Sequence, residues 1–309
     1  MTQLHYKWPV MGHGKALQLL ENDIQNNSVS HAYLFDGPEK LGKTLVARTF
    51  AQILQCRHNF CRICSTCKQV EKGQHIDTME LLDDGQAIKV DKVRELMSLL
   101  ATTSSSRHKI VFIKNINRMG TAAANALLKS LEEPIPGVVF ILTSTQSHAL
   151  LDTIISRCRV IPFHPHAETL IADHLKASSP DMDEEMIHMM AGFSMGRSGR
   201  AMEFLNDPDY FRFYQDMYQQ ITHLLDRSTT TERMMYAATV AEDDEHRTAF
   251  FELFSHILRG LILEKIKGHE VPYRFDQLFD MVESLNQARF EVDHNVNARV
   301  ALEKLMMNV

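Results

Sequence analysis

The clearest structural signal in this chain is the stretch Ala32-Tyr33-Leu34-Phe35-Asp36-Gly37-Pro38-Glu39-Lys40-Leu41-Gly42-Lys43-Thr44. Its first residues predict a strand, and Gly37 to Thr44 matches the phosphate-loop pattern G-x-x-x-x-G-K-[ST] at every fixed position. An apolar helical pattern continues from Thr44 to Leu54. In such a loop the backbone N–H groups from Gly37 to Gly42 surround the phosphates, Lys43 reaches the β- and γ-phosphates, and the Thr44 hydroxyl binds Mg²⁺. The stretch predicts an α/β domain that binds ATP or ADP, and the alternative is a glycine-rich turn that only ends a strand.

A nucleotide hydrolase also needs a carboxylate after a later apolar strand, where it supports the metal and orients the attacking water. The later strand is expected at Lys109–Ile113, and the sequence Lys114-Asn115-Ile116-Asn117 follows it without an acid. We therefore predict nucleotide binding without hydrolysis. The alternative is an active ATPase that takes its carboxylate from Asp36, Glu132 or Glu133.

Length and composition limit the classes of protein to which the chain can belong. At 309 residues it is expected to hold more than one core, by the rule of roughly 100–200 residues per domain. Its net charge of −6 argues against broad, phosphate-driven binding of nucleic acid. No stretch approaches the roughly 18 apolar residues of a membrane span, and Met1–His5 lacks the features of a signal peptide. We expect a cytoplasmic protein without membrane contact.

The chain is expected to have three parts. Residues 1–165 alternate short apolar runs with helical patterns, which predicts a parallel sheet whose further strands lie at Val138–Leu142 and Arg159–Phe163. Residues 166–207 predict a small helical unit interrupted by glycines, and residues 208–309 predict long amphipathic helices. A stripe of apolar residues in this last part is expected to be bundle core; it comprises Phe250, Phe251, Phe254, Ile257, Leu258, Leu261 and Ile262.

A cysteine cluster in residues 56–67 has the spacing C-x₄-C-x₂-C-x₂-C and comprises Cys56, Cys61, Cys64 and Cys67. Four thiolates at this spacing suit tetrahedral Zn²⁺ and leave no open coordination position, so we predict structural rather than catalytic zinc. Disulfides or free surface thiols are the alternatives, and a cytosolic location disfavours disulfides. His58 and His75 are nearby substitutes if one cysteine does not bind, and Cys158 is expected to be a small buried residue.

Arg157, in Ser156-Arg157-Cys158, precedes the last predicted strand and has two interpretations. It pairs with a surface acid, as a lone arginine usually does, or it acts as an arginine finger that stabilises charge on a phosphate held by another subunit. Composition does not separate the two. Arg197 and Arg200 would likewise be ordinary surface charges without further context.

Taken together, these segments resemble the bacterial clamp-loader subunits of DNA polymerase III, a family within the AAA+ ATPases. The matching segments, in the family's order, are His31-Ala32-Tyr33-Leu34-Phe35, the four-cysteine module, His75-Ile76-Asp77, Ile88-Lys89-Val90-Asp91-Lys92-Val93-Arg94-Glu95-Leu96, the helix from Ala124 to Pro134, and Ser156-Arg157-Cys158. The good match covers residues 31 to about 165, and Asn297-Ala298-Arg299 resembles the start of the family's last helix.

The resemblance implies an AAA+ α/β domain with a parallel sheet, a helical lid, and an all-α collar that joins a five-subunit ring. It also implies a role in replication, because the loader opens the sliding clamp and closes it around primed DNA, using ATP bound between subunits. The implied partners are the delta and tau/gamma subunits of a hetero-pentamer, and, through that complex, the clamp and DNA.

The resemblance assigns roles to individual residues. Arg157 would reach the ATP of the neighbouring subunit, Arg200 matches the second-sensor arginine of its own site, and Thr143 is the candidate first sensor. The acids of the tau/gamma motors are replaced here at Lys114-Asn115, which selects a delta prime type of subunit, a stator that does not hydrolyse ATP. A tau/gamma-like motor and a zinc-bearing structural adaptor with a vestigial loop stay open as alternatives. The first two cysteines are closer together than is usual, so Cys56 is the least secure zinc ligand.

Overall fold

The computed structural model describes residues 5–81, 85–100 and 106–308. The chain divides into two compact units. The first consists of Met1–Glu184 and Gly196–Met202, and the second of Glu185–Met195 and Glu203–Val309.

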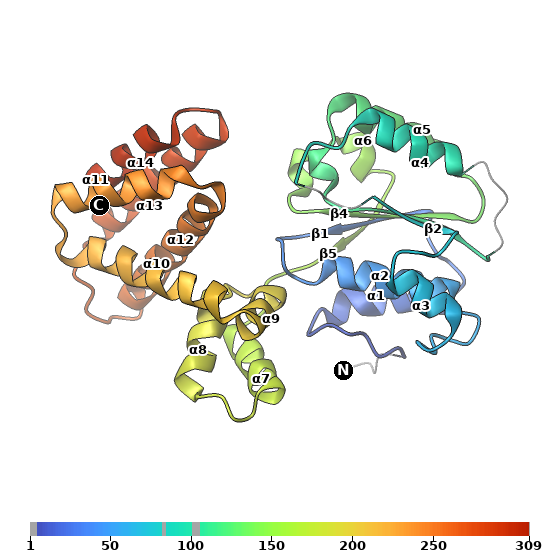
Figure 1. Cartoon of the computed structure of the whole chain (residues 1–309), viewed down its shortest axis with the longest axis horizontal. Helices are drawn as coiled ribbons and strands as arrows, with labels where there is room; N and C mark the ends of the chain where they lie inside the picture. Colours follow the sequence, from blue (N-terminus) through green and yellow to red (C-terminus); the bar gives the residue numbers. More distant parts are fainter. Residues whose placement is uncertain (1–4, 82–84, 101–105, 309) are drawn as a thin grey trace. The chain divides into compact units, whose positions relative to one another are not determined.

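The first unit is built on a five-stranded sheet in which every strand pair is parallel (Figure 1). Its strands are β1 (Ala32–Asp36), β2 (Thr78–Leu81), β3 (Lys109–Ile113), β4 (Val138–Ser144) and β5 (Arg159–Pro162), in the spatial order β2-β3-β4-β1-β5. Since β1 lies between β4 and β5, its carboxyl end is flanked by theirs, with Asp36 opposite Ser144 and Pro162. In parallel sheets this edge is where ligands bind.

Helices cover both faces of the sheet, which explains why its strands are apolar on both sides. One face carries α1 (Gly14–Gln25), α2 (Lys43–Gln55) and α3 (Ser65–Glu71); the other carries α4 (Val90–Leu99), α5 (Thr121–Glu132) and α6 (Asp152–Ile155) (Figure 1). Successive residues of β1 enter different cores, since Tyr33 and Phe35 pack with Phe50 of α2, whereas Leu34 packs with Leu127 of α5. The 3-10 turns η1 (Ile116–Arg118) and η2 (Ser147–Ala149) and the helix α7 (Glu168–Ser178) complete the connections.

The remaining helices are α8 (Glu184–Phe193), α9 (Ser198–Asn206), α10 (Pro208–Arg227), α11 (Thr230–Glu242), α12 (Asp244–Ile266), α13 (Phe275–Asp293) and α14 (Ala298–Met307). Several begin at side-chain caps, including Asp207 before α10, Asp243 before α12 and Asn297 before α14. Thr229 and Glu232 form a reciprocal capping box at α11. Phe250, Phe251, Phe254, Ile257 and Leu258 of α12 are buried, and Leu261 and Ile262 are partly buried.

The predicted fold class, a parallel α/β domain followed by helices, is confirmed. Strands β1 and β3 have the predicted bounds, β4 extends two residues further, to Ser144, and β5 ends one residue earlier, at Pro162. Strand β2 and helix α1 were not predicted. The division at residues 165 and 207 stays a prediction. Among the described residues, none of the helices combines the length and the apolar character that a membrane span requires.

Candidate nucleotide site and cysteine cluster

The phosphate loop connects β1 to α2 and lies against the ends of both neighbouring strands. The Gly37 N–H donates to the Ser144 carbonyl of β4 at 3.2 Å. On the other side, a Cβ atom added to Gly37, whose φ is +145°, would lie 2.1 Å from the carbonyl oxygen of Phe163. Only glycine fits this position. The first glycine of the loop is therefore required by its packing against the end of β5, whether or not nucleotide is bound.

Lys43 is bonded to the carbonyl groups of its own loop. Its Nζ donates to the Gly37 carbonyl and, at 2.6 Å, to the Pro38 carbonyl, and the side chain is buried. Burial lowers the pKa of Lys43 to about 8, although the carboxylates of Glu39 and Asp36 act in the opposite direction. The amine that would reach a nucleotide's phosphates must therefore exchange these carbonyl oxygens for phosphate oxygens.

Helix α9 packs on the same loop through a glycine. The Gly199 N–H donates to the Lys40 carbonyl at 2.7 Å, and a Cβ on Gly199 would lie 2.6 Å from that oxygen. Arg200, the residue singled out from the sequence, is the next residue of the helix and is buried. Sequence reasoning missed Gly199; the available signal was the pair Gly196 and Gly199 in a segment otherwise expected to be helical. The sensor role of Arg200 stays a prediction.

Two histidines tie the loop to the segment after β5. The His13 Nε2 lies 2.9 Å from the Leu41 carbonyl oxygen and 3.1 Å from the His166 Nε2. The backbone N–H of His166 donates to the Gly196 carbonyl at 2.8 Å. Burial, and then His166, lowers the pKa of His13 to about 4, so the ring is neutral at pH 7. Neither histidine was predicted, because they are far apart in the sequence.

At the end of β3 the backbone turns sharply where a hydrolase would carry its acid. Asn115 has a left-handed φ of +50° and is buried, and its N–H donates to the Thr143 Oγ1 at 2.9 Å. Thr143, the predicted first sensor, is buried on β4 and its hydroxyl holds this turn. Its contact with nucleotide stays a prediction. Within the described residues, the segment after β3 brings no carboxylate to this edge of the sheet.

The alternative carboxylates named from the sequence have different surroundings. Asp36 ends β1, accepts a hydrogen bond from the Ser147 hydroxyl at 2.7 Å, and keeps its Oδ1 buried without a hydrogen-bond partner among the described residues. Glu132 of α5 forms an ion pair with Arg157, with 3.0 Å between Oε1 and Nη2. Glu133 is exposed at the C-terminal end of α5. Of the three, Asp36 is the one whose charge acts on Lys43.

Arg157 lies just after α6, and 34% of its side chain is exposed. Besides the ion pair with Glu132, its Nη1 donates to the Thr153 carbonyl at 3.0 Å. A partly exposed pair of this kind is worth at most about 1 kcal/mol, so the guanidinium can exchange Glu132 for another anion at small cost. Next to it, Cys158 was predicted to be buried but is only partly buried, because it packs at the margin of the core beneath α5; this partial burial raises the pKa of its thiol to about 12.

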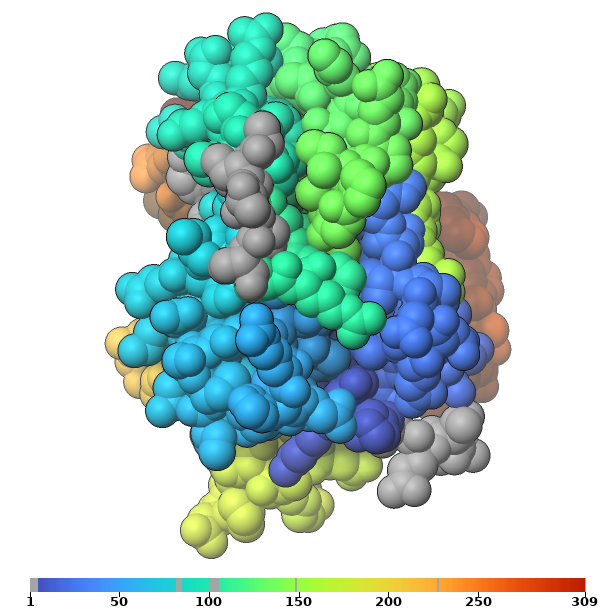
Figure 2. Space-filling view, turned by 90° about the vertical axis from the view of Figure 1, so that its right-hand side faces the viewer, coloured from blue at the N-terminus to red at the C-terminus, as the bar shows by residue number. Residues whose placement is uncertain are grey.

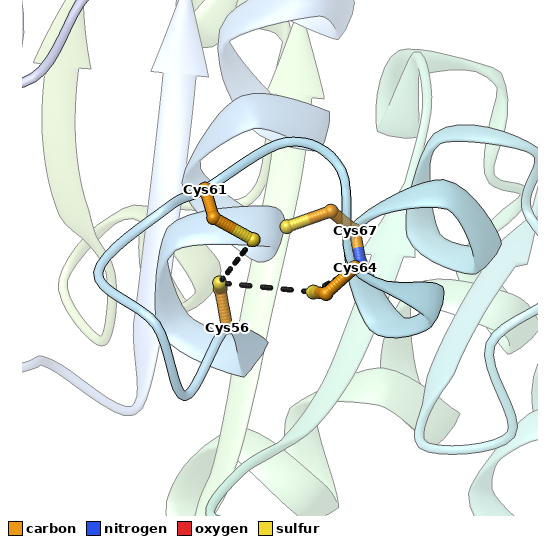
Figure 3. A group of neighbouring side chains, drawn as sticks. All are labelled: Cys56, Cys61, Cys64 and Cys67. Carbon is orange, nitrogen blue, oxygen red and sulfur yellow. Dashed lines mark hydrogen bonds between the residues drawn. The ribbon is translucent and has the colours of Figure 1, made fainter.

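The four predicted zinc ligands converge on one point (Figure 3). The Sγ of Cys56 lies 3.8 Å from that of Cys61 and 4.0 Å from that of Cys64, and all four sulfur atoms, including that of Cys67, lie within 4.8 Å of one another. A tetrahedral zinc ion with Zn–S bonds of about 2.3 Å holds its sulfur atoms about 3.8 Å apart. The cluster is therefore compatible with zinc, and Cys56, the ligand in doubt, is one of the four.

The local chain explains why the cysteines meet. Cys56 follows the end of α2, and Cys64 is the N-cap of α3, where its sulfur accepts the Cys67 N–H. Hydrogen bonds from the backbone at Ile63 and Cys64 lower the pKa of Cys61, which favours its thiolate, whereas burial raises the pKa of Cys67. This segment, light blue in Figure 2, forms part of the surface of the first unit. His75 lies outside the cluster, with its Nδ1 3.2 Å from the Thr78 hydroxyl, and exposed His58 does not join it.

Comparisons with known proteins agree on one family. The family model described as "DNA polymerase III, delta subunit" matches residues 12–167. The chain is 31% identical over 220 residues to the DNA polymerase III subunit delta' of Bacillus subtilis, covering 68% of this chain and 66% of that protein. It is 38% identical over 173 residues to subunit tau/gamma of Haemophilus influenzae, covering 54% of this chain and 25% of that protein. The chain thus spans less than two thirds of the length of these relatives.

A solved structure of a gamma subunit-related protein from Thermotoga maritima is similar in fold, with a TM-score of 0.49 and 19% identity over 94% of this chain and 97% of that one. The relatives in sequence include both delta' and tau/gamma subunits. They therefore support membership of the clamp-loader family, without separating the two kinds of subunit. The phosphate loop, the parallel sheet and the cysteine cluster all lie within the matched region. The chain belongs to the clamp-loader family of DNA polymerase III subunits.

Proposed function

We propose that this chain is a delta prime type of clamp-loader subunit, a stator that helps to load the sliding clamp onto primed DNA. It donates Arg157 to ATP held by a neighbouring motor subunit and does not hydrolyse ATP itself. The observation that carries the proposal is the end of β3, where Asn115 and a turn held by Thr143 occupy the place of the motor's acid.

The chain's own loop holds ATP or ADP with Mg²⁺ in this proposal, without turning it over. Gly37, Gly42, Lys43 and Thr44 would contact the phosphates and the metal, while Thr143 and Arg200 would sense them. Support comes from the N-terminus of α2, which begins at Lys43 directly after Gly42, so that its backbone N–H groups are available to an anion. Lys43 must first leave the carbonyls of its own loop.

Arg157 acts outside its own subunit because of where its side chain lies. It is partly exposed and is held by an ion pair that a phosphate can replace. A guanidinium placed against a transferring phosphoryl group stabilises the charge that develops there, and such fingers raise turnover by roughly 10³–10⁵-fold. Within the chain, Glu132 keeps the guanidinium in place until the neighbour's nucleotide arrives.

The cysteine cluster has a structural role in this proposal. Cys56, Cys61, Cys64 and Cys67 would hold one zinc ion and so fix the segment between α2 and α3. We expect one zinc per chain by elemental analysis, and loss of that zinc in Cys64→Ser. Full-length protein that is folded and zinc-free after purification with zinc present would contradict the assignment.

The partners follow from the same proposal. The subunit would join delta and tau/gamma subunits in a hetero-pentamer in the cytoplasm and would meet the clamp and primed DNA through that complex. The relatives named delta' and tau/gamma support this assembly.

A second candidate is an active, tau/gamma-like motor, and one residue favours it. Asp36 has a buried oxygen without a hydrogen-bond partner among the described residues, and its charge acts on Lys43. Asp36 could therefore support a metal in place of the missing acid. Glu132 is less suited, because it is already paired with Arg157.

ATP turnover and nucleotide titration separate the candidates. The stator predicts that the purified chain binds ATP or ADP but does not hydrolyse ATP. Hydrolysis by the chain alone that both Lys43→Ala and Asp36→Asn abolish would establish the motor instead. Failure to bind either nucleotide would favour a zinc-bearing adaptor with a vestigial loop.

A further inference from the structure

A groove of about 490 Å³ lies beside the cysteine cluster, on the first unit and away from the phosphate loop. The ends of α1 and α2, the N-terminal segment around Tyr6 and the segment just before β3 form its walls. Its polar lining includes Asn27, Gln55, Arg57, Asn59 and Arg107, and none of its lining residues is acidic. The aliphatic side chains of Ile24, Val29 and Leu54 complete it.

The groove is positively charged although the chain as a whole carries a net charge of −6. Arg57 and Arg107 are both exposed, and within the described part of the chain neither forms an ion pair with a carboxylate. The Arg107 Nη2 donates to the Asn27 Oδ1 at 3.2 Å, which holds this guanidinium at the groove. Two uncompensated guanidinium groups at one groove favour an anionic ligand.

Two polar atoms at the inner side of the groove have no hydrogen-bond partner among the described residues. They are the Oε1 of Gln55, whose side chain is buried, and the Nδ1 of His108. The Gln55 Nε2 donates to the carbonyls of Asp77 and His108, at 3.2 Å and 2.8 Å, which fixes the amide so that its buried Oε1 is an acceptor. Buried polar atoms are rarely left without a partner. The inner wall of the groove is therefore polar, whereas the charged groups that a ligand can reach are those of the exposed Arg57 and Arg107.

We propose that this groove binds an acidic peptide segment of a partner protein. Its carboxylates pair with Arg57 and Arg107, and an apolar side chain lies against Ile24 and Val29. The sugar-phosphate backbone of a nucleic acid brings no apolar side chain to Ile24 and Val29. Bases also need aromatic faces to stack on, and Tyr6 packs edge-on against Phe60. The observations therefore favour a peptide over single-stranded nucleic acid.

Fluorescence anisotropy with the full-length, zinc-loaded chain tests the proposal. The probe is a labelled hexapeptide that alternates aspartate and leucine; a hexapeptide that alternates lysine and leucine and a labelled oligothymidylate serve as comparisons. We expect the aspartate peptide to bind more tightly than either. Arg57→Ala and Arg107→Ala should each weaken its binding by about tenfold, as the loss of one charge-assisted hydrogen bond implies.

Lys72→Ala is the matched control, because Lys72 is an exposed cation near the cysteine cluster that does not line the groove. It should leave the affinity for the peptide unchanged. Arg57 follows Cys56 directly, so the zinc content of Arg57→Ala must equal that of the wild type; Arg107→Ala tests the groove independently of the cluster. Absence of peptide binding, equal loss in Lys72→Ala, or arginine-dependent binding of the oligothymidylate instead would overturn the proposal.

Discussion

The phosphate loop and the segment around Arg157 carry the two groups that we propose to act on phosphate, and the surroundings of the two groups are opposite. Lys43 of the loop is buried and donates to carbonyl groups of its own loop. Arg157 is partly exposed and is held by an ion pair with Glu132. The Lys43 amine therefore has its hydrogen-bond partners within its own loop, whereas the Arg157 guanidinium is partly exposed to solvent.

This difference is consistent with the proposal that the subunit keeps a phosphate loop and yet acts on the site of another subunit. Releasing Lys43 breaks two hydrogen bonds from a buried amine, while releasing Arg157 breaks one partly exposed ion pair of at most about 1 kcal/mol. The chain can thus offer Arg157 to a neighbour more easily than it can reorganise its own loop. Substitutions on the two sides should consequently have separable effects.

The largest expected effect is that of Arg157→Ala on the neighbouring subunit. In a reconstituted loader, turnover at the site that receives Arg157 should fall by roughly 10³-fold or more, because the transition-state charge loses its partner. Arg157→Lys should recover little of this turnover, since an ammonium group cannot form the planar, bidentate hydrogen bonds that a guanidinium makes with phosphate. Single-turnover hydrolysis in the assembled complex measures this.

Glu132→Gln is the control for that variant. It removes the ion pair but leaves the guanidinium in place, so turnover should be maintained or raised. If Glu132→Gln loses as much activity as Arg157→Ala, the pair is structural and the finger is not supported.

The next largest effect is expected on the loop side. Gly37→Ala places a methyl group 2.1 Å from the Phe163 carbonyl oxygen at a φ that disfavours any side chain. We expect a loss of about 3 kcal/mol in the free energy of unfolding. Gly14→Ala is the matched control, since nothing lies within 4 Å of its added Cβ. Urea unfolding should separate the two variants, and equal stabilities would show that the loop does not pack on β5 as described.

Lys43 gives a pH dependence to nucleotide binding. Its amine must be charged to attract phosphate, and its pKa is lowered to about 8 in the ligand-free chain. Affinity for ADP should therefore fall as the pH rises above 8, by at most about tenfold per pH unit for one proton. Calorimetric titration at pH 7 and pH 9 measures this. Lys43→Ala should bind ADP weakly at both pH values; an unchanged pH dependence in that variant would assign it to another group.

The smallest effect concerns His13, which ties the loop to His166. The pKa of its ring is about 6.5 when unfolded and about 4 when folded, so both states are neutral above pH 6.5. As the pH falls from 6.5 to 4 the unfolded chain takes up the proton first, and stability is lost over that window. His13→Asn should reduce this loss in urea titrations at pH 7.5 and pH 5. Identical losses in variant and wild type would refute the role of His13.

Local patterns predicted those parts of the fold that depend on neighbouring residues. The sequence predicted β1, β3, β4, β5 and α2. The strands could be recognised as continuous apolar runs because helices cover both faces of the sheet. Strand β2, Thr78-Met79-Glu80-Leu81, was missed because it is short, lies at the sheet edge and contains a charge. In the described structure that charge, on Glu80, pairs with Arg48 of α2 at 2.9 Å.

The candidate site was predicted only where its residues follow a local motif. The phosphate loop and the four cysteines have fixed spacings, so both were visible in the sequence. The contacts of Gly199 with Lys40 and of His13 with His166 join segments more than 150 residues apart, as the numbering shows. No local pattern encodes such pairs. The roles of Arg157 and Arg200 came from resemblance alone.

Reconstitution of the loader with Lys43→Ala or Arg157→Ala in this chain alone tests the central claim most directly. The other subunits stay unchanged, and steady-state ATP hydrolysis is measured in the presence of clamp and primed DNA. The account predicts that Arg157→Ala removes the share of hydrolysis contributed by the neighbouring site, while Lys43→Ala leaves hydrolysis at the wild-type level. The opposite pattern, with loss in Lys43→Ala and full activity in Arg157→Ala, would contradict it.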